Sequence, residues 1–110
     1  MYRLLVWLVP TVDKFPRSQK FLLGDRIQGI ALDVLEHLIE ATFTRSRMAH
    51  LQQANLGLEK LRVMIRLAHE FHHIDTRRYE HAARQIDDVG RLVGGWRRAQ
   101  IDHDSAPPEP

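Results

Sequence analysis

The sequence predicts an all-α protein, an antiparallel four-helix bundle whose successive helices run up, down, up and down. Apolar residues recur at alternating steps of three and four through three long segments, which is the period of an amphipathic helix. No segment shows the strict alternation of a strand, and only a few residues separate one periodic segment from the next. A chain of 110 residues can form one domain with a modest core, which association with further copies could extend.

The first two predicted helices differ in length. The first dozen residues form a short apolar helix that contains Trp7, and Pro10 either kinks this helix or marks its true start. The second helix covers about residues 18–45, after Pro16, whose missing N–H has no partner to lose at the first helical position. Its core-facing residues are expected to be Leu23, Ile27, Ala31, Val34, Leu38 and Ala41.

The third and fourth predicted helices repeat the same apolar spacing. The third covers about residues 47–72, after a possible cap at Thr44 or Ser46, and the fourth covers about residues 76–98, with Asp75 placed to cap its first turn. The third seam consists of Leu51, Ala54, Leu58, Leu61, Ile65 and Ala68, and the fourth of Tyr79, Ala82, Ile86, Val89 and Val93. Because the first helix is short, the long helices should keep uncovered apolar surface, and self-association is the simplest way to bury it.

Composition narrows the class of protein and of partner. The chain has no cysteine, which excludes disulfides and thiolate sites, and its apolar run Leu4–Val9 is too short for a signal peptide or a membrane span. A cytoplasmic protein is therefore expected, with the bundle in residues 1–101 and a disordered, acidic, Pro-rich tail in residues 102–110. Three of the 14 acidic side chains lie in that tail, which leaves 11 against 16 basic ones and favours a polyanionic or acidic partner.

Four arginines of the fourth predicted helix are spaced seven residues apart, so they should form one row along it, away from the apolar seam. This arginine row consists of Arg77, Arg84, Arg91 and Arg98. Arg62 and Arg66, with His69 and His73, make a shorter line on the third helix. Lys14, Arg17 and Lys20 form a basic corner where the first segment leads into the second helix.

Guanidinium groups suit bidentate contact with phosphate or carboxylate groups. Three interpretations stay open: contact with nucleic acid, pairing with acidic residues of neighbouring helices or subunits, and binding of an acidic protein surface. Few aromatic residues lie among the arginines, so nucleic-acid binding would be to backbone phosphates and independent of base sequence.

A zinc-protease motif occurs in the sequence, and we interpret it as a coincidence. His69, Glu70 and His73 satisfy H-E-x-x-H, which on a helix would place both histidines as zinc ligands beside a general base. No convincing third ligand follows, and a di-iron bundle would need a second Glu-x-x-His. The sequence therefore predicts no metal site and no cofactor, with a zinc hydrolase as the alternative that metal analysis would decide.

Three glycines lie within six residues of the fourth predicted helix. Gly90 and Gly94 share one face and would allow another helix to approach closely, either from the same bundle or from another subunit. Alternatively, Gly94 and Gly95 end the helix, with Trp96 folded back over its last turn.

Four segments, taken in order, resemble one protein family. They are residues 15–27 from Phe15-Pro16-Arg17 to Leu23-Gly24-Asp25-Arg26-Ile27, Leu32-Asp33-Val34-Leu35-Glu36, Ala54-Asn55 with Leu58-Glu59-Lys60-Leu61-Arg62, and Val89-Gly90-Arg91-Leu92-Val93-Gly94-Gly95-Trp96. They are similar to the accessory variability protein, Avd, of diversity-generating retroelements. More distantly, the chain resembles the four-helix-bundle proteins encoded by intervening sequences in bacterial ribosomal RNA genes. The resemblance covers about residues 7–98 and gives no role to the histidine-rich segment or the tail.

The resemblance implies a non-catalytic role. Avd proteins form basic homopentameric barrels of four-helix bundles and associate with the retroelement's reverse transcriptase and RNA. They thereby support error-prone cDNA synthesis that diversifies a target gene at template adenines. The alternative is an interaction protein of the ribosomal intervening-sequence type without a reverse-transcriptase partner. The arginines of the third and fourth helices and the basic corner are the candidate contacts, an assignment that rests on spacing alone.

Overall fold

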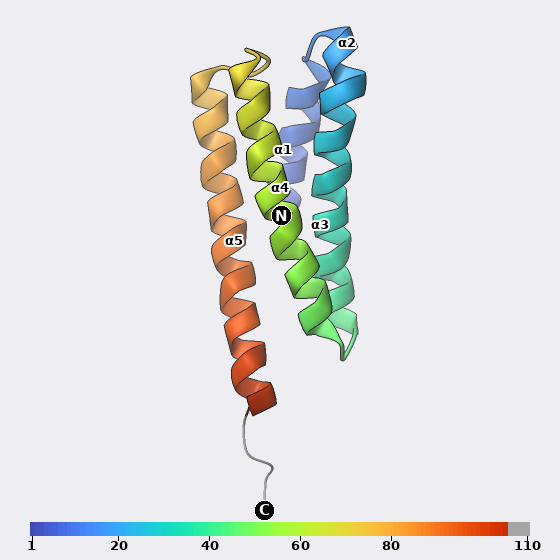
Figure 1. Cartoon of the computed structure of the whole chain (residues 1–110), viewed down its shortest axis with the longest axis vertical. Coiled ribbons are helices and arrows are strands. Elements are labelled where there is room, and N and C mark those ends of the chain that lie inside the picture. Colours follow the sequence, from blue (N-terminus) through green and yellow to red (C-terminus); the bar gives the residue numbers. More distant parts are fainter. Residues whose placement is uncertain (106–110) are drawn as a thin grey trace, which may run out of the picture.

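A computed structural model describes residues 1–105, and within this range the chain is helical with no strand. Its elements are α1 (Tyr2–Asp13), α2 (Arg17–Gln19), the π-helical turn η1 (Lys20–Gly24), α3 (Asp25–Phe43), α4 (Arg47–Glu70) and α5 (Thr76–Ser105). Because α2, η1 and α3 follow one another without a break, they form one helical rod. The described chain is therefore built from four rods, in agreement with the predicted helical bundle (Figure 1).

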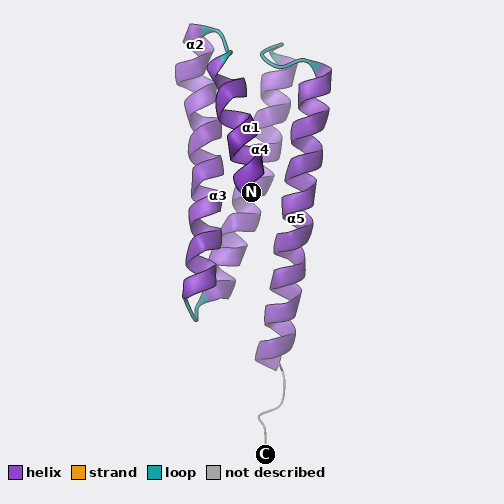
Figure 2. Cartoon of the chain, turned by 180° about the vertical axis from the view of Figure 1, so that it is seen from behind, coloured by secondary structure: helices purple, strands orange, loops and turns teal. Residues whose placement is uncertain are grey.

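The four rods run antiparallel, in the predicted up-down-up-down order (Figure 1). The packed neighbours are α3 with α4, α4 with α5, and α1 with both α3 and α5. Seen from behind, α1 lies between α3 and α5 and runs along only the half of their length nearest α2 (Figure 2). No helix within residues 1–105 combines the length and the apolar character that a membrane crossing requires.

The core consists of the apolar seams that the sequence predicts. All six seam residues of α4 are buried, as are Ala82, Ile86, Val89 and Val93 of α5. In α3 and η1 the buried seam residues are Leu23, Ile27, Ala31, Val34 and Ala41, while Leu38 and Tyr79 are only partly buried. The short helix α1 contributes Leu4, Leu5, Leu8 and Val12 to the same cluster.

The start of the second rod differs from the prediction in two details. Pro16 was expected at the first helical position but is the cap residue, with extended backbone angles, and the helix begins at the next residue, Arg17. The turn Lys20–Gly24 then widens to a π-helix, and the Asp25 N–H donates to the carbonyl of Lys20 five residues earlier. A Cβ on Gly24 would lie 2.6 Å from Cγ1 of Val12, so glycine allows α1 to pack closely against this turn.

A second glycine, which the sequence analysis did not single out, sets the approach of α3 to α4. A Cβ built on Gly57 of α4 would lie 2.5 Å from Cγ2 of Val34, a buried residue of α3. Any larger side chain would push these two helices apart at the centre of the core. Gly57 therefore has the close-packing role that was predicted for Gly90 and Gly94.

The last helix begins where predicted and ends later. The Arg78 N–H donates to the Asp75 carboxylate at 2.8 Å, which confirms the predicted cap. The helix continues past Gly94 and Gly95 to Ser105, so these glycines do not end it and residues 102–105 of the expected tail are helical. This end of α5 projects beyond the α3–α4 connection (Figure 1), and residues 106–110 of the expected tail lie outside the described residues.

Candidate nucleic-acid and partner-binding surfaces

The arginine row lies on the outer face of α5. The residues that α5 buries are Ala82, Ile86, Val89 and Val93, and at 100° per residue the row points away from them. All four arginines of the row are exposed. The predicted separation between the basic face and the apolar seam is therefore present.

Within residues 1–105, one arginine of the row has an ion-pair partner and three have none. The Arg91 guanidinium forms an ion pair with Asp88 of the same helix. No carboxylate of residues 1–105 lies within 4.0 Å of a guanidinium nitrogen of Arg77, Arg84 or Arg98. These three positive charges are therefore available for a phosphate or carboxylate of another molecule.

The shorter line on α4 also contains one paired and one unpaired arginine. Arg62 donates to Asp87 of α5 and also pairs with Glu59, and the hydrogen bond to Asp87 raises its pKa above the usual guanidinium value. This contact ties α4 to α5, so Arg62 is engaged in the fold. Arg66, one turn further along, is exposed and has no ion-pair partner within the described chain.

Two shallow hollows flank the arginine row. One, of about 420 Å³, lies between α4 and α5, and Arg91 and Arg98 line it together with Gly90, Gly94 and the Arg62–Asp87 pair. The other, of about 440 Å³, lies between α1 and α5 and is lined by Arg77, Arg84, Arg78, His81 and Trp7. The tertiary fold thus joins arginines and glycines that the sequence analysis considered separately.

Gly90 and Gly94 do not meet another helix within the described residues 1–105. A Cβ on Gly90 would touch nothing within 4 Å, and one on Gly94 would meet only the Arg98 guanidinium at 3.8 Å. The interpretation that they admit a helix of the same bundle is therefore wrong. Close packing of another subunit on these glycines stays a prediction.

The basic corner lies at the same end of the bundle as the start of α5. Lys20 pairs with Asp13 at 2.6 Å, while Lys14 and Arg17 are exposed. The ring of Phe15, between these residues, lies 5.4 Å from the ring of His73 in the α4–α5 connection. Consequently the α1–α2 connection, which contains Lys14, shares one end of the molecule with the start of α5, where the arginine row begins (Figure 1).

The H-E-x-x-H residues do not adopt the geometry of a zinc site. Helix α4 ends at Glu70, and His72 has a positive φ of 62°, so His73 is not one helical turn beyond His69. The His69 ring stacks on Tyr79 at 4.6 Å, and its Nε2 lies 3.2 Å from the Thr76 hydroxyl. These contacts assign His69 and His73 to the packing of the α4–α5 connection.

Two hollows on the bundle expose apolar side chains. Between α3 and α5, next to Met1 at the start of the chain, Leu38, Ile39, Val89, Val93 and Trp96 line a hollow of about 310 Å³, and Leu92, which also lines it, is 74% exposed. Between α3 and α4, a groove of about 980 Å³ contains Phe21, Leu22, Ile30, Val63 and Met64. The apolar surface expected from the shortness of α1 is therefore present at the first of these hollows.

Sequence reasoning missed two groups of polar residues. Arg45, in the connection between α3 and α4, and Arg47, the first residue of α4, line a hollow with Trp96 and His103 of α5. The pattern Arg-Ser-Arg at a turn was the available signal. The second group brings together His37, Glu40 and His50, and only His37-x-x-Glu40 on one helix was visible beforehand.

Comparison with known proteins identifies one family. No curated protein and no solved structure matches the chain. A family model described as bAvd-like matches residues 1–100, which span all of the bundle except the last turn of α5. This match agrees with the resemblance to Avd in the sequence analysis. The chain belongs to the bAvd-like family.

Proposed function

We propose that this protein is a non-catalytic accessory subunit of a diversity-generating retroelement. It would bind the element's reverse transcriptase and, through its basic surfaces, the phosphate backbone of template RNA or cDNA, and so support mutagenic cDNA synthesis. The match of the bAvd-like family to residues 1–100 carries this proposal. An adaptor needs surfaces rather than a reactive centre, and the outward arginine row with its three unpaired members supplies one.

Self-association belongs to the same proposal. The two apolar surfaces lie between different pairs of helices and differ in their lining residues, which favours a head-to-tail contact between unlike surfaces over a two-fold contact between like ones. Head-to-tail contacts that close produce a ring, and the family resemblance suggests five copies. In such a ring the outer face of α5, which carries the arginines, lies away from the apolar contacts.

The experiment is co-expression with the reverse transcriptase encoded beside the chain. A complex that survives gel filtration in moderate salt is the expected result. If both proteins are folded and elute separately, the reverse-transcriptase role fails. The interaction-protein alternative, of the ribosomal intervening-sequence type, would then remain.

A further inference from the structure

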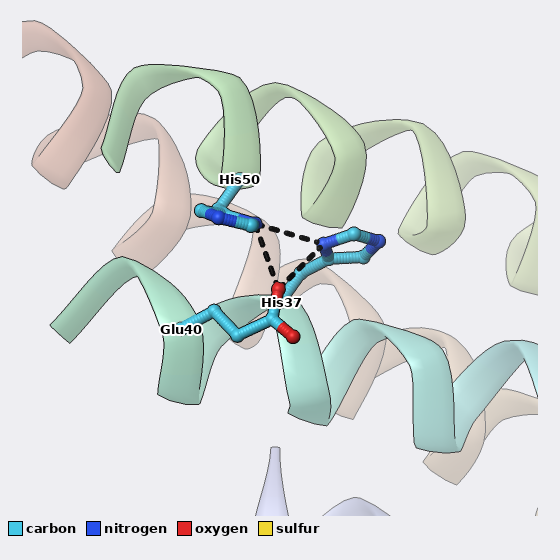
Figure 3. Close-up of side chains that lie close together, drawn as sticks. All are labelled: His37, Glu40 and His50. Atoms are coloured by element: carbon cyan, nitrogen blue, oxygen red, sulfur yellow. Dashed lines mark hydrogen bonds and ion pairs between the residues drawn. The ribbon is translucent and has the colours of Figure 1, made fainter. Parts of the chain in front are cut away.

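Three side chains from two helices converge between α3 and α4, well away from the arginine row. His37 and Glu40 lie one turn apart on α3, and His50 is the fourth residue of α4 (Figure 3). The two Nδ1 atoms are 3.2 Å apart, and the Glu40 Oε2 lies 3.0 Å from Nδ1 of His50 and 3.8 Å from Nδ1 of His37. All three ligand atoms thus form a small triangle.

The size of this triangle matches the face of a coordination tetrahedron. Zinc binds imidazole nitrogen and carboxylate oxygen at roughly 2.0–2.1 Å, which places the ligand atoms of a tetrahedral site about 3.3–3.4 Å from one another. Two of the observed separations, 3.0 and 3.2 Å, are slightly shorter than this value, and the third, 3.8 Å, is slightly longer. One ion above the triangle would therefore contact all three atoms with little movement of the side chains.

The types of ligand select the class of metal. Two imidazoles and one carboxylate suit zinc and neighbouring first-row divalent ions, whereas magnesium and calcium prefer oxygen ligands only. The side chains of His37 and His50 are 32% and 26% exposed, and that of Glu40 is 53% exposed. An ion can therefore enter from solvent, and water can complete its coordination.

We propose that His37, Glu40 and His50 bind one divalent transition-metal ion, with Zn²⁺ as the best fit, and that this ion pins the start of α4 to the end of α3. The start of α4 needs such support. Its cap residue Ser46 makes no side-chain hydrogen bond to the first turn, so this end of the helix lacks the usual side-chain cap. On α3 the two ligands lie towards the C-terminus, where the helix dipole favours a cation.

Zinc titration of the full chain without an affinity tag tests the proposal. With a competing chromophoric chelator, the wild-type protein should bind one Zn²⁺ per chain, and its melting temperature should rise with zinc concentration because the ion binds the folded state. His50→Ala should weaken binding by more than about 100-fold, since even loss of a residue that only supports a ligand weakens binding 10–100-fold. Co²⁺ in place of Zn²⁺ should show the visible absorption bands of a tetrahedral site.

Two control variants separate this site from the other histidines. His103→Ala, at an exposed position on α5, and His69→Ala, in the H-E-x-x-H segment, should bind zinc as the wild type does. His50→Gln, with helix content checked by circular dichroism, replaces His50→Ala if that variant unfolds. Absence of zinc binding by the wild type, or binding that survives in the folded His50 variant, would overturn the proposal and leave a hydrogen-bonded triad.

Discussion

Replacing Arg77, Arg84 and Arg98 with glutamine removes three exposed guanidinium groups that have no carboxylate partner within residues 1–105. If each contacts one phosphate of a single strand, the slope of log affinity against log salt should become shallower by about 2 per contacting subunit, since each contact contributes roughly 0.7. When salt rises from about 50 to 200 mM, both proteins lose affinity, and the loss should be about 20 times larger for the wild type than for the triple variant. For duplex nucleic acid the corresponding difference is about 40-fold.

Fluorescence anisotropy with labelled single-stranded RNA of two unrelated sequences measures these slopes. Both sequences should be affected equally, because backbone contacts carry no base information. Arg91→Gln should change the slope less than Arg84→Gln does, since Arg91 must leave Asp88 to reach a phosphate. A double variant at Arg3 and Arg45, two exposed arginines outside the row, is the control, and its effect on the slope is compared per charge removed.

The refuting result is an unchanged slope in a triple variant that keeps its helix content. If the same variant also loses its oligomeric state, the row binds acidic residues of another subunit. If the control double variant flattens the slope as strongly per charge removed, binding follows net charge and not the row.

Three further outcomes are expected. Gly57→Ala should lower the free energy of unfolding by about 1–3 kcal/mol in chemical denaturation, because its methyl group would overlap Val34; unchanged stability would refute the close packing. Light scattering or native mass spectrometry should find an oligomer, with five copies suggested by the family, and Leu92→Glu should weaken it without loss of helix content; a stable wild-type monomer at micromolar concentration would contradict this. His69→Ala and His73→Ala should leave reverse-transcriptase binding intact in the co-expression assay, whereas loss of that binding together with loss of bound zinc in both variants would reinstate the hydrolase alternative.

The sequence was sufficient to predict the parts of the fold that depend on local pattern. The spacing of apolar residues determined the seams, and the position of Asp75 determined the start of α5. The end of α5 was not predictable in this way, because glycine at 94 and 95 disfavours a helix only by about 1 kcal/mol each. Burial of Val89 and Val93 just before them supports the helix against that cost.

The candidate surfaces were predictable only within a single helix. A spacing of seven residues is enough to place four arginines on one face, and the structure has them there. The pairing of Arg62 with Asp87, by contrast, depends on how α4 lies along α5, and the convergence of His50 on Glu40 depends on how α4 lies along α3. Such registers follow from the packing of whole helices, which no short pattern records.

Reconstituted cDNA synthesis is the decisive assay for the accessory role. The reverse transcriptase and template RNA of the element would be incubated with and without the purified chain, and the products sequenced. Full-length cDNA with substitutions opposite template adenines should form only when the chain is present, and the triple arginine variant should reduce its yield. Equal yield and equal error frequency without the chain would contradict an accessory role in mutagenic reverse transcription.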